Sequence, residues 1–249
     1  MKNRIPYLRK EKIMELLSSK DVITIDEIQN SIPDISTSSI RRDLKTLESE
    51  GRVVLLSGGA VRSANENLDL PIVEKSYHNK NEKNVIAEMA AELVDEGDTI
   101  FIDSGTSCTA FASKLLNRNI TIVTTNTSLT TLKFAKAQVM LLGGISSYER
   151  SSVYGPVTEK NMTQFYFSKA FIGTSGLDVN KGATTANIFE SNVKRLAHEA
   201  SKTTYVLCDS SKFGRIFANS AFLLQDIIVI SDKWDDSIGN VVPMITPDQ

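Results

Sequence analysis

The chain has few of the residues that build disulfide-linked or metal-bound proteins. Its 249 residues include two cysteines, two histidines and one tryptophan. Cys108 and Cys208 are too few and too far apart in the sequence for a disulfide framework or a metal knuckle. His78 and His198 are equally isolated, so neither a catalytic triad nor a metal site is indicated. We therefore predict no catalytic residue, no metal and no cofactor.

Long apolar runs are also missing. Charged or polar residues interrupt every apolar stretch within about ten residues, roughly half the length of a membrane-spanning helix. The basic N-terminus, Met1–Pro6, leads into an amphipathic pattern rather than the apolar core of a secretory signal. We expect a cytoplasmic protein with reduced thiols and no membrane partner.

The net charge of −2 is divided unevenly along the chain. Residues 1–62 carry 11 Lys and Arg against 9 Asp and Glu, and residues 63–249 carry 17 against 21. The small positive balance does not prove contact with nucleic acid, but it favours the N-terminal end for any such contact. With 41% apolar residues, the chain can form one large domain or two unequal ones.

Two helices are predicted at the start of the chain. Apolar residues at helical spacing indicate a helix over residues 6–19. Thr24 and Glu27 form a capping box that opens a second, short helix, and Pro33 ends it because its ring cannot continue the hydrogen-bond ladder. The positions expected to face inward are Ile13, Leu16, Leu17, Ile25, Ile28 and Ile32.

A third helix follows after a tight connection. Ser36 is a favourable N-cap, and we expect the helix to run to about Glu50 and to stop at Gly51. Its inward positions are Ile40, Leu44 and Leu47. Two helices joined in this way, with polar and basic residues at the start of the second, are typical of a helix-turn-helix.

The outward arc of the third helix holds hydroxyl and basic side chains. Short hydroxyls near the start of a recognition helix can approach base edges and phosphates, and arginine can bind guanine or phosphate. A charged arc is more often a solvated surface, and Arg41–Arg42 alone would not exclude that. With three helices in this order, we favour contact with double-stranded DNA. The candidate contacts are Thr37, Ser38, Ser39, Arg41, Arg42 and Lys45.

Residues 52–62 read as a β-hairpin that turns at or near Gly58–Gly59. Behind a recognition helix such a hairpin forms a wing, and Arg62 could then reach the phosphate backbone. A hairpin that only covers the helices is an almost equally good interpretation, because few charges lie on it. Residues 1–62 are therefore expected to form a DNA-binding domain, followed by a polar linker over residues 63–82.

Beyond the linker, helices alternate with strands that are apolar on both faces. This pattern predicts an α/β domain over residues 83–235, with a mostly parallel sheet covered on both sides, and a tail over 236–249. The expected strands are 100–103, 120–124, 139–142, 170–173, 205–208 and 227–230. The expected helices are 83–94, 107–116, 129–134 and 189–200.

Small and polar residues follow several of these strands. In parallel sheets, ligands bind beyond the carboxyl ends of the strands, so these loops should converge on one crevice. Hydroxyls, backbone amides and one cation suit a phosphate monoester. Any one loop alone would be an ordinary strand–helix turn. The candidate ligand residues are Asp103, Ser104, Gly105, Thr106, Ser107, Thr125, Asn126, Gly143, Gly144, Gly182, Thr184, Thr185 and Lys212.

Two details stay open at this point. Asp103 could bind a sugar hydroxyl or cap the helix that begins at Thr106 or Ser107. Glu190 and Lys194 lie four residues apart on a helix, where a surface ion pair is the default interpretation.

These motifs together resemble the DeoR-type family of bacterial transcriptional repressors. The resemblance covers nearly the whole chain in order, through Ser39–Leu44, Leu47–Glu48, Gly51, Gly58–Ala60, Glu82–Lys83, Asp103–Ser107, Thr125–Asn126, Gly143–Gly144 and Asp209–Gly214. It implies an N-terminal winged helix-turn-helix followed by a sensor domain for a phosphorylated sugar. The family usually has Arg and His in the wing where this chain has Leu55 and Ser57.

The second domain also resembles the fold of ribose-phosphate isomerases and coenzyme-A transferases. An isomerase needs a general base and stabilisation of an enediolate. The segment after Phe171–Ile172, where the isomerase pattern has aspartates, offers no carboxylate before Asp178. We therefore predict a repressor of a sugar-metabolism operon, released from its operator by a phosphorylated sugar and working as a homo-oligomer, dimer or tetramer. A phosphosugar isomerase-like enzyme with an accessory N-terminal domain is the alternative.

Overall fold

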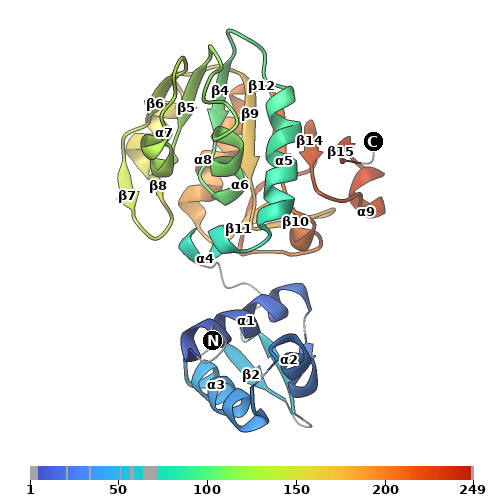
Figure 1. Cartoon of the computed structure of the whole chain (residues 1–249). Helices are drawn as coiled ribbons and strands as arrows, with labels where there is room; N and C mark the ends of the chain where they lie inside the picture. The colour runs from blue at the N-terminus through green and yellow to red at the C-terminus, as the bar shows by residue number, and fades with distance from the viewer. Residues whose placement is uncertain are drawn as a thin grey trace. The chain divides into compact units, whose positions relative to one another are not determined.

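A computed structural model describes residues 5–20, 22–33, 35–50, 52–56, 59–63 and 72–247 of the chain. The chain divides into two compact units, Met1–Leu68 and Asp69–Gln249 (Figure 1). Gly51 and Gly58, which carry the expected helix stop and part of the expected hairpin turn, lie outside the described residues, as does Ser57 of the wing. Among the described residues, no helix is long and apolar enough to cross a membrane.

The N-terminal unit contains the three expected helices and a small sheet. Its elements are α1 Pro6–Ser19, β1 Val22–Thr24, α2 Ile25–Ser31, α3 Thr37–Ser49, β2 Val53–Leu55 and β3 Ala60–Ser63. The capping box of Thr24 and Glu27 is present at the start of α2, and the Ser36 hydroxyl accepts from the Ser39 amide at the start of α3. The three strands pair antiparallel in the order β1-β3-β2, so the expected hairpin gains a third strand.

One apolar cluster holds this unit together. Fully buried positions come from every helix and from the strands: Ile13, Ile28, Ile40, Leu44, Leu47 and Val61. These include the inward positions that helical spacing predicts for α3, so the opposite arc of α3 faces away from the core.

The C-terminal unit is built on a seven-stranded sheet in the order β15-β14-β12-β9-β4-β5-β6. Every pairing in it is parallel, as expected from the alternation of strands and helices. The strands are β4 Thr99–Ile102, β5 Thr121–Thr124, β6 Gln138–Leu141, β9 Phe167–Gly173, β12 Ser201–Leu207, β14 Ile227–Ile230 and β15 Met244–Ile245.

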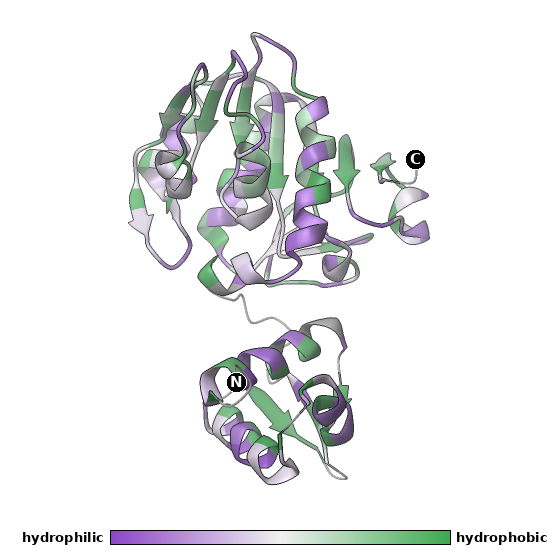
Figure 2. Ribbon diagram, in the orientation of Figure 1, coloured by the Kyte–Doolittle hydropathy of each residue, from purple (hydrophilic) through white to green (hydrophobic). Residues whose placement is uncertain are grey.

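Helices cover both faces of this sheet. In Figure 1, α5 Lys80–Glu92 and α6 Thr106–Ala112 lie on the face toward the viewer, and α7 Pro156–Met162 and α8 Ile188–Glu199 belong to the other face. Alternate residues of β4 point to opposite faces of the sheet: Ile100 and Ile102 pack in the hydrophobic cluster on one face, and Phe101 packs in the cluster on the other. Apolar residues accordingly dominate strands β4 and β14 (Figure 2).

The remaining elements are short and lie around the sheet. They are α4 Ile72–Tyr77, the 3-10 helices η2 Thr127–Thr131 and η3 Ser210–Lys212, the hairpin β7 Ile145–Ser147 with β8 Ser152–Tyr154, the small sheet of β10 Gly176–Asp178, β11 Gly182–Thr185 and β13 Asn219–Phe222, and α9 Asp236–Gly239.

Three expectations differ from the structure. The helix expected over 129–134 is the 3-10 turn η2, and the helix expected over 107–116 ends at Ala112. The expected tail, 236–249, contains α9 and β15, and β15 pairs with β14 at the sheet edge. These short elements have too few residues for hydrophobic periodicity to reveal them.

Candidate nucleic-acid interface and effector pocket

The outward arc of α3 carries the candidate DNA contacts. Ser38, Arg41, Arg42 and Lys45 are exposed, and Thr37 and Ser39 are half-buried. All six therefore lie on or beside one surface, with the hydrophobic core behind them. This arrangement suits insertion of the helix into a DNA groove.

Hydrogen bonds at the start of α3 fix its position against α2. The Thr37 hydroxyl donates to Oε1 of Gln29 in α2 at 2.9 Å. The Ser36 hydroxyl lies 3.0 Å from the Ser39 hydroxyl and also accepts the Ser39 amide. Because these short side chains already have partners within the unit, the longer basic side chains are the groups best able to reach a duplex.

The wing is less basic than the helix. Arg62 is exposed on β3, the central strand of the small sheet, opposite Val22 and Val54. The Leu55 amide donates to the Glu48 carboxylate at 3.3 Å, which joins β2 to α3. The hairpin thus braces the recognition helix and offers one candidate phosphate contact.

In the C-terminal unit, Asp103 lies beneath the predicted ligand loop. It is 1% exposed, and its carboxylate accepts the Gly173 amide at 3.1 Å and the ammonium of Lys194. Burial alone would lower the pKa of Lys194, but attraction to Asp103 outweighs it and holds that pKa above its ordinary value. Asp103 therefore anchors the loop to β9 and α8 and caps no helix, since Gly105 is the N-cap of α6.

The expected surface pair of Glu190 and Lys194 is not formed. Lys194 is buried against Asp103, whereas Glu190 accepts from Arg150 at 3.1 Å and from the Thr185 hydroxyl at 3.1 Å. The spacing of four residues was correct for two neighbours on a helix, but both side chains find partners on other elements. Helical spacing alone carries no information about such partners.

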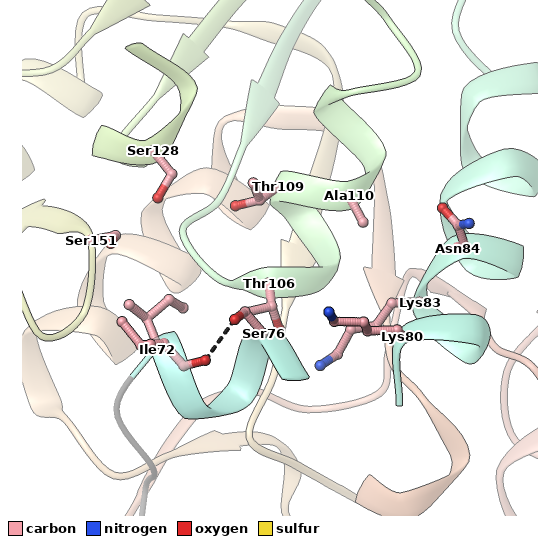
Figure 3. A pocket seen from close by; sticks show the side chains of 11 residues that line it. Ile72, Ser76, Lys80, Lys83, Asn84, Thr106, Thr109, Ala110, Ser128 and Ser151 are labelled. Carbon is pink, nitrogen blue, oxygen red and sulfur yellow. Dashed lines mark hydrogen bonds between the residues drawn. The ribbon is translucent and has the colours of Figure 1, made fainter. Parts of the chain in front are cut away.

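A pocket of about 460 Å³ opens beside the start of α6 (Figure 3). Four elements contribute to it, with the amino groups of Lys80 and Lys83 pointing from α5 toward Ser76 and Thr106. The lining residues are Ile72, Val73, Ser76, Lys80, Lys83, Asn84, Thr106, Thr109, Ala110, Ser128 and Ser151. Its polar groups are hydroxyls, one amide and two ammonium groups, with no carboxylate among the lining residues.

Two of the predicted loops reach this pocket. Thr106 lines it directly, in the loop that also holds Ser104, Gly105 and Ser107. Asn126 is buried behind it, donating to the Thr109 hydroxyl at 2.9 Å and accepting the Ser128 amide at 2.9 Å. Asn126 thus positions two lining residues, and its buried neighbour Thr125 accepts the Val153 amide through its carbonyl.

Lys83 is a buried lining residue that the candidate ligand residues did not include. It is 7% exposed, and its ammonium donates to the carbonyls of Lys75 and His78, both at 2.6 Å. Burial lowers its pKa to about 8, so it stays mostly protonated at neutral pH. Its place in the apolar stripe of α5, three residues before Ile86, was the signal that could have revealed a buried lysine.

Lys212 belongs to a cationic group next to this pocket. Burial lowers its pKa, and the charge of Asp209 opposes that effect. Asp209 also attracts Lys83 and accepts the side-chain amide of Asn79 at 2.9 Å. The charge of Asp209, which follows β12, therefore attracts both Lys212 and Lys83. Lys212 does not line the pocket.

Five other candidate ligand residues have internal roles and do not line the pocket. Gly143 accepts the Thr158 hydroxyl at 2.8 Å, and a side chain at Gly144 would meet Thr158 and the carbonyl of Tyr154. A side chain at Gly182 would meet the backbone of β13. Thr184 and Thr185 are buried, and their hydroxyls donate to Gly176 and Glu190. Small and hydroxyl residues here allow close backbone packing.

The described part of the chain has no cluster of three His, Cys, Asp or Glu side chains that could hold a metal ion. Both cysteines are buried, and burial raises the pKa of Cys208 well above its ordinary value.

Comparison with known proteins agrees with this division of roles. Residues 9–66 match the model of a DeoR-like helix-turn-helix domain, and residues 78–233 match the DeoR C terminal sensor domain. The chain belongs to the DeoR family.

Relatives match over most of this DeoR-family chain. FruR of Bacillus subtilis, described as an uncharacterized HTH-type transcriptional regulator, is 33% identical over 96% of this chain and 98% of its own. AccR of Agrobacterium fabrum, a transcriptional repressor, is 28% identical over 94% and 93%. The protein is thus a DNA-binding transcriptional regulator, and the expectation that it is not an enzyme is confirmed by these matches.

Among solved structures, ribose 5-phosphate isomerase A from Methanocaldococcus jannaschii is similar to the sensor fold. It is 16% identical, with a TM-score of 0.41, over 55% of this chain and 56% of its own.

We predict that Gly182→Ala destabilises the protein more than Gly214→Ala, by roughly 2 kcal/mol or more. Both glycines have a φ of +69°, so both substitutions carry similar backbone strain, but only at Gly182 would the new side chain meet other backbone atoms. Urea unfolding of the two variants measures the difference. Equal losses would contradict a packing role for Gly182.

Proposed function

We propose that this DeoR-family protein represses a sugar-metabolism operon and that a phosphorylated sugar, bound in the α6 pocket, releases it from operator DNA. The observation that carries the proposal is Lys83, a buried ammonium in the wall of a hydroxyl-lined pocket, which donates to the carbonyls of Lys75 in α4 and of His78 just after it. The name of its relative AccR, a transcriptional repressor, supports repression over activation.

A phosphate monoester suits the chemistry of this pocket. Lys80 and Lys83 supply positive charge, and the hydroxyls of Thr106, Thr109 and Ser128 supply neutral donors. Charge-assisted bonds of this kind are about twice as strong as neutral ones. The volume of about 460 Å³ lies in the range of small-molecule sites and leaves room for a sugar. Lys212, beyond Asp209, adds to the positive potential.

Coupling to the DNA-binding unit runs through α4 in this proposal. Ile72 begins α4 and donates its amide to the carbonyl of Glu149 at 2.9 Å, and the carbonyls of Lys75 and His78 at the other end accept from Lys83. Three residues of α4 also line the pocket. A ligand in the pocket therefore touches the segment that continues from the linker.

Lys83 can serve the ligand and α4 at the same time. An ammonium has three N–H groups, of which two donate to the α4 carbonyls, and the third can donate to a phosphate. A bound phosphate then fixes α4 through Lys83. To act as an inducer, the ligand must favour the arrangement that does not bind DNA, by about 1–3 kcal/mol in typical cases of such coupling.

A repressor of this kind is expected to be a homo-oligomer, a dimer or a tetramer. Two-fold symmetry lets a pair of α3 helices address the two halves of an operator. Its partners would be double-stranded operator DNA and the sugar phosphate, and its place of action the cytoplasm.

Replacing Arg41 or Arg42 by alanine is expected to weaken binding to operator DNA and to flatten its salt dependence by up to about 0.9 in slope for each lost phosphate contact. Fluorescence anisotropy over a series of salt concentrations measures both quantities, with Arg195→Ala, a substitution on the exposed α8 pair with Glu199, as the control. If both variants bind operator DNA with wild-type affinity and wild-type salt dependence, α3 does not form the interface.

A sugar phosphate that raises the melting temperature should dissociate the protein–DNA complex, and Lys83→Met should shift that response to higher ligand concentration while DNA binding persists. Loss of one buried charge-assisted bond is expected to weaken the ligand about tenfold or more. Thermal-shift screening of sugar phosphates followed by anisotropy titration tests this, with Lys202→Met, an exposed position at the start of β12, as the matched control. A normal response of the Lys83→Met variant would count against the pocket.

A further inference from the structure

Asp43 is an unusual residue on the inner face of α3. Its neighbours on that face are apolar, namely Ile40, Leu44 and Leu47, and it is only 4% exposed. A carboxylate in such a place must be hydrogen-bonded and paired, because burying an unpaired charge is strongly unfavourable. It directly follows Arg41 and Arg42, the candidate DNA contacts.

The partner of Asp43 is Arg9 in α1. The guanidinium donates from Nε to Oδ2 at 2.6 Å and from Nη2 to Oδ1 at 3.0 Å. The two planar groups are therefore joined edge to edge by two hydrogen bonds. The two side chains are 11% and 6% exposed. A pair with two parallel bonds fixes orientation as well as distance. The pairs of Lys10 with Glu50 and of Arg52 with Glu11 in the same unit are both more exposed.

The apolar contacts of α3 with the core do not fix its rotation in the same way. Apolar burial depends on area and has little directionality. Successive residues of a helix are about 100° apart around its axis, so a small rotation moves the side chains on the outer arc away from their targets. Asp43 faces inward at the position next to Arg42, and its bond to α1 therefore sets the direction in which Arg41 and Arg42 leave the surface.

We propose that Arg9 and Asp43 are positioning residues for DNA recognition: their buried pair fixes the rotation of α3, so that its basic arc meets specific base edges rather than the phosphate backbone alone. Neither residue needs to touch DNA. Their loss should therefore reduce discrimination between sequences more than it reduces general attraction to DNA.

The chain offers a matched control. Lys10, the next residue of α1, pairs with Glu50 just beyond the end of α3 at 2.6 Å, but this pair is more exposed, at 18% and 37% for the two side chains. It also joins α1 to the α3 region, yet with one bond and in contact with solvent. Exposed pairs of this type contribute little.

The test measures affinity of the full-length chain for two duplexes: one selected by the wild-type protein from a random library and one of scrambled sequence. Arg9→Gln and Asp43→Asn should each weaken binding to the selected duplex about tenfold, the loss expected for roughly one misread base pair. Binding to the scrambled duplex should change by less than about twofold, since the phosphate contacts and the salt slope remain.

Arg9→Lys, which keeps the charge but offers no guanidinium fork, should recover only part of the discrimination. Lys10→Gln should leave the ratio of the two affinities at its wild-type value. Circular dichroism shows whether each variant is folded, and Asp43→Asn, the mildest change, keeps the shape of the side chain should Arg9→Gln fail to fold.

An unchanged ratio in the variants overturns the proposal, whether both affinities stay normal or fall together as the folded fraction falls. If the wild-type chain prefers the selected duplex and the Arg9 and Asp43 variants keep the same ratio of affinities, this proposal is overturned and the α3 interface is not. Absence of any sequence selectivity in the wild-type chain overturns the α3 interface as well.

Discussion

A buried ammonium must find hydrogen-bond acceptors, and the arrangement of the effector pocket follows from how Lys83 meets this requirement. Its acceptors are the carbonyls of Lys75 and His78 at the end of α4. These bonds help to hold α4, which supplies three residues of the pocket wall, against α5. The same ammonium lies beside hydroxyls that suit a phosphate. Lys83 thus joins the wall of this pocket to α4.

Each unit contains a buried ion pair beside a candidate functional surface. In the N-terminal unit, Arg9 and Asp43 hold the recognition helix. In the sensor unit, Lys194 and Asp103 hold the loop that follows β4. Such pairs add little net stability, because desolvation offsets much of their attraction. What they provide is direction, which apolar packing lacks. The outer arc of α3 and the Thr106 loop are therefore presented by rigid supports.

Much of the fold could be predicted from the sequence, because long amphipathic or doubly apolar segments show it directly. The three N-terminal helices, the capping box of Thr24 and Glu27 and the parallel sheet follow from periodicity and caps. The loop at Thr106 and the buried Asn126 follow from the rule that ligands bind at the carboxyl ends of strands. The roles of Lys83, Asp43 and Gly182 could not be read in this way, because each depends on a partner distant in the chain. The packing roles of Gly143, Gly144, Thr184 and Thr185 could not be predicted for the same reason, since close packing and ligand binding favour the same small residues.

Hydrogen–deuterium exchange of residues 72–79 in the full-length protein tests the central claim most directly, with and without a saturating sugar phosphate taken from the thermal-shift screen. If the ligand binds Lys83 and fixes α4 through it, the amides of α4 should exchange about tenfold more slowly in the complex, a change of about 1.4 kcal/mol in local stability. Unchanged exchange in α4 at full occupancy of the ligand would show that the pocket does not communicate with the linker through Lys83.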